Sequence, residues 1–367
     1  MTEQALLHEP LSAPQLITQP DNHAAITLLQ ELVAIPSVSG DEHAAVQYLV
    51  AQMAALGFTA SIDGAGNAVG SIGEGQPETV LLGHIDTVPG AIPVRQESGR
   101  LYGRGAVDAK GALAAFVIAA ARLHAQGRLN GRIVVIGCVE EEVASSRGAH
   151  YVVERYCPDQ CIVGEPSGWN RVTLGYKGSL RLTCRAIGPC THSAHDHLTA
   201  PERISALWQQ IAGYAAAFNA ERERAFDQLL PTLLSINSGS DGLSEWSVAE
   251  ISIRLPLDLL PDALAAAVQG FDPQVKVTVQ GAVPAFQAER SSPLARSLTR
   301  AIRQQSMQPG LVLKTGTADM NIVGPAWRCP IVAYGPGDAA LDHTPDEHIV
   351  LDEYLLAIRV LEAALGQ

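Results

Sequence analysis

The stretch GALAAFVIAAARLHAQGRLNGRIVVIGCVEEE (residues 111–142) decides the fold. Its first half is an alanine-rich apolar run typical of a buried helix, and Gly127 ends that run. RIVVIGCV (residues 132–139) follows as a continuous apolar run with the length of a buried strand. Three glutamates (residues 140–142) stand directly behind this strand, although only 17% of the chain is charged. A solvated turn is the simplest interpretation of the glutamates, and the rest of the chain has to decide whether it suffices.

The alternation of strand and helix continues on both sides of this stretch. ETVLLGHID (residues 78–86) and QCIVGE (residues 160–165) are strand-like, and GAHYVVERY (residues 148–156) is helical. Two amphipathic helical patterns come earlier, one ending at Pro36 and the other at Gly57. Such alternation predicts an α/β fold with a mixed, mostly parallel sheet that carries helices on both faces.

The pattern changes after Pro166. RVTLGYKGSLRLTCRAIG (residues 171–188) alternates like one half-exposed antiparallel strand, and helical and strand-like segments then follow as a β-α-β-α-β unit. The earlier pattern returns from Pro293, with a helical segment, the strand-like PIVAYGP and a last helix. We therefore predict an α/β domain of residues 1–172 and 284–367, interrupted by a smaller α+β domain of residues 173–283. The first twenty or so residues are expected to form a loose arm or an edge element.

Composition excludes several classes of function. The net charge of −13 argues against binding to nucleic acid or an anionic membrane as the main activity, so a small molecule or a metal ion fits better. The N-terminus has no basic segment followed by an apolar core, and no run of about 18 apolar residues occurs, which predicts a cytoplasmic protein. The six cysteines form no CxxC pair and are expected to be reduced.

Potential metal ligands follow five successive strand-like runs. In open α/β sheets, ligands bind at the carboxyl ends of the strands. The side chains found there are His84 with Asp86, Asp108, the three glutamates, Glu165, and Asp342 with His343. A lone residue of this kind is usually a turn former. Clustering so many anions at one sheet edge is costly without a counterion, and metal ions would remove that cost.

Two histidines and three carboxylates are too many ligands for one tetrahedral zinc ion. They suit two zinc ions that share a bridging carboxylate and activate a water molecule. Such a site needs one more carboxylate, which takes the proton of the water and passes it to the leaving group. Adjacent glutamates behind a strand point in different directions, so one of the three can bind metal while its neighbour acts as the base.

Six motifs resemble one family. In chain order they are GHIDTVPG, GRGAVDAKG, VEEEVASSRGA, VGEPSG, GTADMN and DHTPDEH, and they extend over nearly the whole chain. This set resembles the dinuclear zinc aminoacylase and carboxypeptidase family, which includes acetylornithine deacetylase and succinyl-diaminopimelate desuccinylase. The resemblance implies that His84 and Glu165 hold one zinc ion, that Glu142 and His343 hold the other, and that Asp108 bridges them. Cobalt or manganese can share such ligands.

The resemblance also implies roles for residues that do not bind metal. Glu141 becomes the general base, and Asp86 becomes the carboxylate that holds the second ring nitrogen of His84. Glu140 stands where the family commonly has an aspartate, and is expected to be structural. If Glu140 and Glu141 faced the metals instead, Glu141 would be the metal ligand and Glu140 the general base.

The inserted domain matches the family's lid, which mediates formation of a homodimer. The lid is expected to supply a histidine to the partner subunit's site, where it stabilises the oxyanion of the reaction. His192 fits best, with His195 and His197 as alternatives. On the substrate side, the resemblance implies that Arg254 binds the substrate carboxylate, with a structural ion pair as the alternative. Backbone or hydroxyl groups of Gly316 and Thr317 are also expected to contact the substrate.

The stretches VGEPSGWNRVTLGYKGSL and KTGTADMNIVG look closest to one branch of the family. That branch frees lysine or ornithine from a small acidic amino-group carrier protein in lysine and arginine biosynthesis, and is sometimes described as acetyl-lysine deacetylase. The resemblance predicts hydrolysis of the amide between a glutamyl carboxylate and the α-amino group of lysine or ornithine. Asp319 either binds the distal ammonium group of the product or stabilises the loop in which Asp319 lies. An N-acetylornithine or N-acetyl-lysine deacetylase, a dipeptidase and a non-catalytic relative are the alternatives.

An acidic carrier requires a local basic surface, because the chain itself is acidic. Five basic residues near the start of the lid are expected to form a rim for it: Arg171, Lys177, Arg181, Arg185 and Arg203.

Overall fold

The computed structural model describes residues 19–192 and 197–366. Helices are α1 (Asn22–Ala34), α2 (His43–Ala55), α3 (Lys110–Ala125), α4 (Arg147–Val153), α5 (Ala200–Asn219), α6 (Pro261–Phe271), α7 (Pro293–Gln304), α8 (Met320–Trp327) and α9 (Leu351–Leu365), with 3-10 turns η1 (Ala225–Asp227) and η2 (Ala339–Leu341). Most of the loose arm expected at the N-terminus lies outside the described residues.

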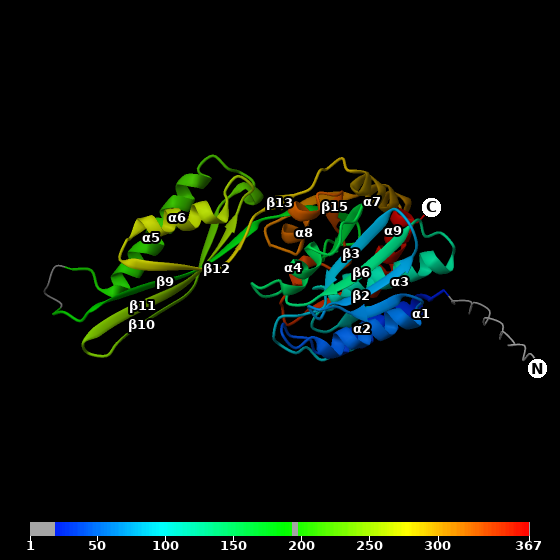
Figure 1. The fold of residues 1–367 in the computed structure, drawn as a ribbon, viewed down its shortest axis with the longest axis horizontal. Coiled ribbons are helices and arrows are strands. Elements are labelled where there is room, and N and C mark those ends of the chain that lie inside the picture. The colour runs from blue at the N-terminus through cyan, green and yellow to red at the C-terminus, as the bar shows by residue number, and fades with distance from the viewer. Residues whose placement is uncertain (1–18, 193–196, 367) are drawn as a thin grey trace, which may run out of the picture.

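The strands form three separate sheets. They are β1 (Thr59–Ile62), β2 (Ala68–Gly73), β3 (Glu78–His84), β4 (Arg95–Glu97), β5 (Arg100–Tyr102), β6 (Arg132–Cys138), β7 (Gln160–Gly164), β8 (Arg171–Tyr176), β9 (Gly178–Pro189), β10 (Leu230–Ser240), β11 (Ser244–Leu255), β12 (Val275–Val283), β13 (Phe286–Gln287), β14 (Gly310–Lys314), β15 (Ile331–Ala333) and β16 (His348–Val350). Figure 1 shows the two parts that they build, with β9 to β12, α5 and α6 on the left and the larger sheet with its helices on the right.

The larger sheet is mixed. Its described strands run in the order β1-β2-β6-β3-β7-β15-β8-β13, and β14 pairs with β8 alone. The central strands β6, β3, β7 and β15 are mutually parallel, so their carboxyl ends meet at one edge. Strand pairing at β1-β2, β2-β6 and β13-β8 is antiparallel. The predicted fold class, a mixed and mostly parallel sheet interrupted by an α+β domain, is confirmed.

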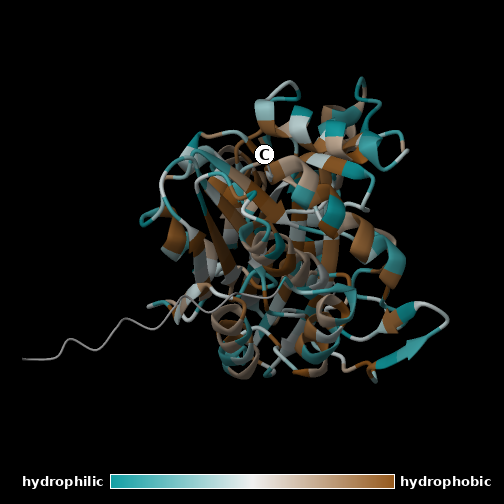
Figure 2. Cartoon of the chain, turned by 90° about the vertical axis from the view of Figure 1, so that its right-hand side faces the viewer, coloured by the Kyte–Doolittle hydropathy of each residue, from teal (hydrophilic) through white to brown (hydrophobic). Residues whose placement is uncertain are grey.

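Helices cover both faces of this sheet because its strands are apolar on both sides. Leu81 of β3 and Val135 of β6 join a buried core with α1, α2, α3, α7 and α9. Their neighbours Val80 and Val134 point the other way and join a second core with α4 and α8. Helix α3 is buried almost along its full length, as its alanine-rich sequence predicts. Figure 2 shows the apolar strands at the centre of the larger part, with hydrophilic segments outside.

The inserted domain is a separate antiparallel sheet of order β10-β11-β9-β12, with α5 and α6 on one face. The predicted β-α-β-α-β unit lacked one strand, β10, whose sequence LPTLLSINSGS ends in small polar residues. That strand lies at the edge and exposes Leu234 and Ile236, so its apolar pattern does not follow a buried face. The boundaries at residues 172/173 and 283/284 remain a prediction.

The single strand predicted for residues 171–188 is wrong. Two strands occupy this segment, and Lys177 separates them: β8 belongs to the larger sheet and β9 to the inserted one. The Lys177 side chain is fully buried, and its ammonium donates to the carbonyls of Ala225, Phe226 and Gln228. This contact ties the crossing point between the two sheets to the segment that contains η1.

Two further predictions concern the chain as a whole. The six cysteines are free, as their spacing predicts. Among the helices of the described residues, none has the length and apolarity needed to cross a membrane.

Candidate metal centre

Three of the predicted ligands lie at the carboxyl ends of parallel strands. His84 is the last residue of β3, Glu165 follows β7 directly, and Glu142 lies four residues beyond the end of β6. The other two reach the same edge from loops, and in this respect the prediction of five strand ends is wrong. The strand before Asp108, β5, belongs to a small separate sheet, so Asp108 lies in the loop that leads into helix α3. His343 lies in a loop after η2 and does not follow β15 directly.

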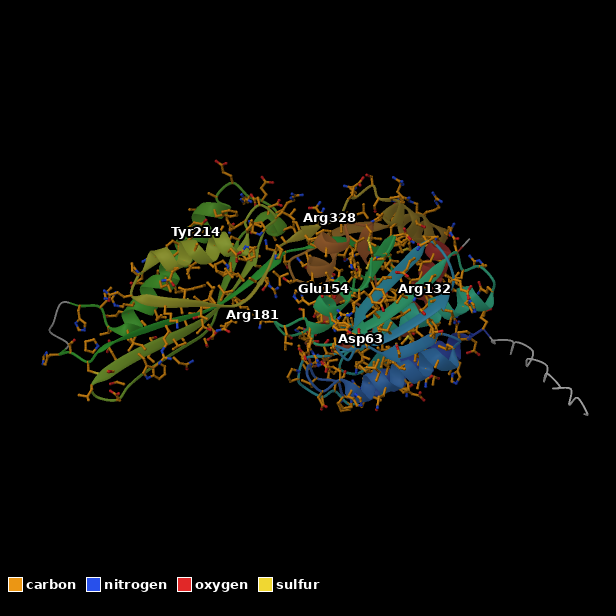
Figure 3. All side chains as sticks on the ribbon, in the orientation of Figure 1. Asp63, Arg132, Glu154, Arg181, Tyr214 and Arg328 are labelled. Carbon is orange, nitrogen blue, oxygen red and sulfur yellow. The ribbon has the colours of Figure 1, made fainter. Side chains whose placement is uncertain are left out.

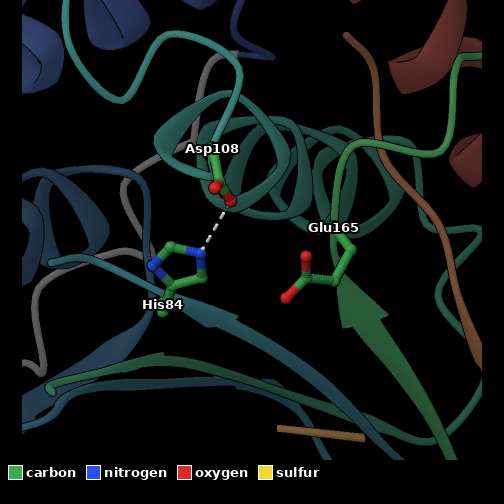
Figure 4. Close-up of side chains that lie close together, drawn as sticks. All are labelled: His84, Asp108 and Glu165. Carbon is green, nitrogen blue, oxygen red and sulfur yellow. Dashed lines mark hydrogen bonds and ion pairs between the residues drawn. The ribbon is translucent and has the colours of Figure 1, made fainter. Parts of the chain in front are cut away.

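The first group of side chains comprises His84, Asp108 and Glu165. One ligand atom from each lies within 4.8 Å of the others, and Nε2 of His84 lies 3.2 Å from Oδ1 of Asp108. Figure 4 shows the three side chains converging, Asp108 from the start of its helix and Glu165 from the end of its strand. His84 is 2% exposed and Glu165 is 8% exposed, so the group lies at the floor of the site.

The second group comprises Asp108, Glu142 and His343. Nε2 of His343 lies 3.0 Å from Oδ2 of Asp108 and 3.0 Å from Oε1 of Glu142. Asp108 therefore belongs to both groups and turns one carboxylate oxygen toward each histidine. A carboxylate shared between two three-residue groups is the arrangement that a pair of metal ions requires.

The electrostatics of the two groups suit cations. Burial alone would lower the pKa of His84, but hydrogen bonds to Asp108 and Asp86 hold it well above its ordinary value. Hydrogen bonds to Asp108 and Glu142 raise the pKa of His343 to about 10. Burial opposes ionisation of Asp108, yet bonds to both histidines lower its pKa. In the metal-free protein, protonated imidazoles thus balance the negative charge of the carboxylates. Metal ions bound by the same nitrogen and oxygen atoms would replace these protons.

Asp86 organises the backbone next to the ligands. Its Oδ1 accepts the N–H of Glu141 at 3.1 Å, and its Oδ2 accepts the N–H of Glu142 at 3.0 Å and the hydroxyl of Ser39 at 2.7 Å. Nδ1 of His84 lies 3.0 Å from the backbone carbonyl of Asp86 and 3.4 Å from its carboxylate. Asp86 therefore fixes the ring of His84 and the two following glutamates together.

The three glutamates point in different directions. Glu140 has a left-handed backbone with φ of 60°, and its carboxylate pairs with Arg147 at 2.9 Å and accepts a hydrogen bond from Ser145 at 2.6 Å. Glu142 turns toward His343. Glu141 lines the cavity between the ligands, and burial raises its pKa well above the ordinary value. A solvated turn does not describe these residues.

Glu347 is a functional residue that sequence reasoning missed. Its Oε1 accepts the N–H groups of Val107 and Asp108 at 2.9 and 3.2 Å, and its Oε2 pairs with Arg104 at 2.7 Å. This buried carboxylate therefore holds the loop that presents Asp108. It belongs to the motif DHTPDEH, which was the available signal.

The ligands open into a cavity of about 820 Å³ between the two parts of the molecule. Arg254 and Arg181 of the inserted sheet line it together with Gly316 and Thr317 of the larger part. Nη1 of Arg254 donates to Oγ1 of Thr317 at 2.7 Å, and Oγ1 of Thr317 donates to the carbonyl of Lys177 at 2.9 Å. A Cβ added at Gly316 would meet nothing within 4 Å, so this wall is open. Arg254 thus bonds a hydroxyl, and it forms no ion pair with a carboxylate in the part of the chain that the structure describes.

Four buried polar atoms near the site have no hydrogen-bond partner among the described residues: Tyr176 OH, both carboxylate oxygens of Asp319 and Oδ1 of Asp342. Tyr176 and Asp342 line the cavity, which makes them available to a bound molecule. Tyr176 was missed, although it lies in the quoted stretch VTLGYKGSL. Asp319 is 2% exposed and is not part of the cavity lining, and burial raises its pKa to about 7. Its position does not support contact with a substrate ammonium group.

The two described histidines of the lid do not line this cavity. His192 and His197 are exposed beyond the end of β9, and neither lines the cavity of its own chain. Oγ1 of Thr191 lies 2.6 Å from Nε2 of His197. His195 lies outside the described residues.

The basic rim predicted near the start of the lid is partly wrong. Lys177 is buried and bound to three carbonyls, so it presents no charge to solvent. Arg203 pairs with Asp272 at 3.2 Å. Arg181 lies on β9 facing the gap between the two parts, as Figure 3 shows, and lines the cavity itself. Arg171 and Arg185 are exposed but come from different sheets.

Known proteins have similar sequences and folds. Residues 80–367 match the family described as peptidase family M20/M25/M40. A [LysW]-lysine hydrolase of Deinococcus radiodurans is 43% identical over 94% of this chain and 97% of its own. A [LysW]-lysine/[LysW]-ornithine hydrolase of Saccharolobus islandicus is 29% identical over 80% of this chain and 82% of its own.

The fold comparison gives the same architecture. An M20 family metallo-carboxypeptidase from Sulfolobus solfataricus superposes with a TM-score of 0.76 at 18% identity, covering 93% of this chain and 98% of its own. A Bacillus subtilis protein described as a dinuclear metal binding peptidase of the same family has a TM-score of 0.68 at 14% identity, covering 94% and 97%. The resemblance seen in the six motifs is confirmed, and the chain belongs to peptidase family M20/M25/M40.

Proposed function

We propose that this chain is a metal-dependent amide hydrolase that releases lysine or ornithine from the glutamyl end of an amino-group carrier protein. The observation that carries the proposal is the pair of ligand groups that share Asp108, with the partly buried Glu141 lining the same cavity of about 820 Å³. The substrate comes from the name of the Deinococcus radiodurans relative, a [LysW]-lysine hydrolase that this chain matches over nearly all of its length.

The donor set fits two divalent metal ions. Imidazole nitrogens combined with carboxylates suit zinc, and cobalt and manganese accept the same donors. His84 and Glu165 would hold one ion, Glu142 and His343 the other, and Asp108 both. When bound, such a pair supplies Lewis-acid polarisation of a carbonyl group and lowers the pKa of water. In both ligand groups the carboxylate of Asp108 pairs with a histidine, and without metal its charge is balanced only when that imidazole is protonated. This need for positive charge supports the assignment.

Glu141 moves the proton in this proposal. Its carboxylate takes a proton from the attacking water and gives it to the α-amino group of the departing lysine or ornithine. Burial raises the pKa of this group, which suits a carboxylate that must both accept and return a proton. Asp86 holds the backbone N–H of Glu141 and so fixes where that carboxylate stands.

Arg254, Gly316 and Thr317 would hold the substrate. The guanidinium of Arg254 already faces the cavity and can bind the free carboxylate of the amino acid that is released. Its present partner, the hydroxyl of Thr317, fixes the guanidinium at the cavity wall. The open space at Gly316 leaves room for the aliphatic chain of lysine.

The second part of the proposal is a homodimer that forms through the lid and brings His192 to the partner subunit's site. The lid exposes large apolar side chains at its far end and open edge, namely Ile187, Leu234, Ile236, Leu243 and Trp246. Exposed apolar surface of this kind marks contact with another chain. His192 lies on the same part of the lid and away from its own cavity. Light scattering of the purified protein tests the dimer, and a monomer would remove this role of His192.

Turnover of four substrates tests the function. The metal-loaded enzyme is assayed with carrier-linked lysine, γ-glutamyl-lysine, N-acetyl-lysine and N-acetylornithine. The proposal expects the highest kcat/KM for carrier-linked lysine or ornithine. Higher kcat/KM for an acetylated amino acid would make the chain a deacetylase, and preference for a dipeptide would make it a dipeptidase. No turnover of any amide would indicate a non-catalytic relative.

A further inference from the structure

We propose that the carrier protein docks through a carboxylate-rich surface on a groove lined by Arg224, Arg290, Arg296 and Arg303, here called the arginine groove. This inference rests on the proposed function, because it concerns the carrier that presents the substrate. The groove lies beside strand β14 and helix α7, away from the rim expected at the start of the lid.

Two adjoining cavities make up the groove. The first, of about 430 Å³, lies between the η1 segment and β14 and is lined by Arg224 and Arg290. The second, of about 600 Å³, lies against α7 and is lined by Arg290, Arg296 and Arg303. Arg290 and Leu311 line both, so the cavities adjoin. Within residues 19–192 and 197–366, no carboxylate lines either one.

Helix α7 supplies the charge of the outer cavity. Its sequence PLARSLTRAIRQ contains three arginines and no acidic residue. Arg296, Arg300 and Arg303 are spaced by four and three residues and therefore share the exposed face, whereas Leu298 and Ile302 enter the core. Among the described residues, Arg290, Arg296, Arg300 and Arg303 form no ion pair with a carboxylate, whereas Arg224 pairs with Asp227 at 2.6 Å.

This concentration of free positive charge needs a reason in a chain with a net charge of −13. Arginines that repel one another along one helix do not stabilise it, because like charges three or four residues apart are unfavourable. Guanidinium groups bind carboxylates through paired hydrogen bonds. A partner surface rich in aspartate and glutamate is therefore the complement of this groove, and it would be repelled by most of the remaining surface.

The groove leads to the metal centre. Leu313 and Thr315 line both the inner cavity of the groove and the 820 Å³ cavity that holds the ligands. Strand β14 runs from Gly310, next to the outer cavity, to Lys314, which lines the catalytic cavity, and it pairs with β8 alone. Its five residues span roughly 15 Å at about 3.3 Å per residue. A carrier seated at the arginines would thus reach the site through a short extended segment.

Because the arginine groove is separate from the metal centre, docking can be tested apart from catalysis. The variant Arg290→Gln/Arg296→Gln/Arg303→Gln removes three exposed charges that touch neither metal ligands nor Glu141. With lysine-loaded carrier protein as substrate, KM should rise about tenfold while kcat changes little, because rim charges act mainly on encounter and docking. KM for γ-glutamyl-lysine and N-acetyl-lysine should stay at the wild-type value, since these substrates do not reach the groove.

A matched control removes the same number of charges elsewhere. Arg100, Arg155 and Arg328 are exposed and line none of the three cavities, so their triple glutamine variant should keep the wild-type KM for the carrier-linked substrate. The salt dependence of that KM should be weaker in the groove variant than in the control.

The outcomes separate the two proposals. Equal KM values for carrier-linked lysine in the groove variant and the control would overturn the docking surface and leave the proposed function intact. Equal increases for carrier-linked and small substrates would also overturn it, because the arginines would then act on the site itself. Failure of the wild-type enzyme to hydrolyse carrier-linked lysine would overturn the proposed function first.

Discussion

At the scale of single residues, three neighbouring glutamates have three different surroundings. Glu140 is paired with Arg147, Glu141 is partly buried and lines the cavity, and Glu142 bonds His343. The left-handed backbone at Glu140 turns the chain so that the next two N–H groups meet Asp86. Backbone conformations of this kind cost energy and occur at functional sites.

The variant Glu141→Gln separates proton transfer from metal binding. It keeps the size of the side chain and removes its basicity, so kcat should fall by about a thousandfold, within the range general acid–base catalysis contributes. Metal content, measured by elemental analysis, should stay near that of the wild type. Glu140→Gln is the matched control and should keep most of the activity. Near-normal kcat for Glu141→Gln would refute its role as the base.

The variant Glu347→Gln tests how Asp108 is held. The amide oxygen of glutamine can accept the N–H groups of Val107 and Asp108 only while its NH2 group faces the Arg104 guanidinium, so the ion pair with Arg104 is lost and a donor lies against a donor. Groups that orient a ligand in this way are worth 10- to 100-fold in metal affinity or activity, and we expect a loss of about that size. Titration with zinc measures it. Glu97→Gln, on an exposed strand, is the control, and an equal affinity in both variants would argue against this role.

At the scale of elements, a buried cation and a bonded carbonyl of the same residue, Lys177, lie at the join between the two sheets. The Lys177 ammonium satisfies three carbonyls between Ala225 and Gln228. Parallel strands β3, β6 and β7 place three ligands, whereas loops held by Glu347 and η2 place the other two. The site therefore depends equally on regular strands and on loops fixed by hydrogen bonds.

The variant Lys177→Met tests this join. Methionine fills similar volume but leaves buried carbonyl oxygens without donors, which should lower the free energy of unfolding by about 3 kcal/mol. Urea denaturation of the metal-free protein measures the change. Lys276→Met, at an exposed position of β12, should cost little by comparison. A loss no greater than that of the control would show that Lys177 does not hold the two sheets together.

At the scale of the whole molecule, metal binding and protonation compete for the same histidines. The pKa of His343 is raised from 6.5 to about 10 in the metal-free fold. Its proton therefore stabilises the metal-free protein fully below pH 6.5, and that stabilisation is lost as the pH rises through about 10. Metal ions require the neutral imidazole, so their affinity increases over the same range.

The difference in Tm between the metal-loaded and metal-free protein should consequently widen from pH 6 to pH 9. Thermal unfolding of zinc-reconstituted and chelator-treated samples at both pH values measures it. His343→Asn should reduce the pH dependence of this difference and leave the part that comes from His84. A difference that stays constant with pH in the wild type would mean that His343 does not exchange its proton for metal.

The sequence alone determined the fold class and the residues that could act. Strand and helix periods depend on nearest neighbours in the chain, so residues 78–165 indicated a parallel sheet and its ligand-bearing edge. The motifs resembling the family named the histidines and carboxylates that the structure brings together. The edge strand β10 and the break at Lys177 were missed, because an exposed strand lacks a buried face and two strands in different sheets can share one continuous alternation.

Only the tertiary structure decided how these residues meet. Which glutamate faces the histidines depends on the backbone turn at Glu140 and on Asp86, 55 residues earlier in the chain. The anchor of Asp108 is Glu347, 239 residues later. The arginine groove likewise joins residues 224, 290, 296 and 303 across two parts of the molecule. Local sequence fixes which chemical groups each segment carries, whereas burial and long-range hydrogen bonds select the direction in which each group points.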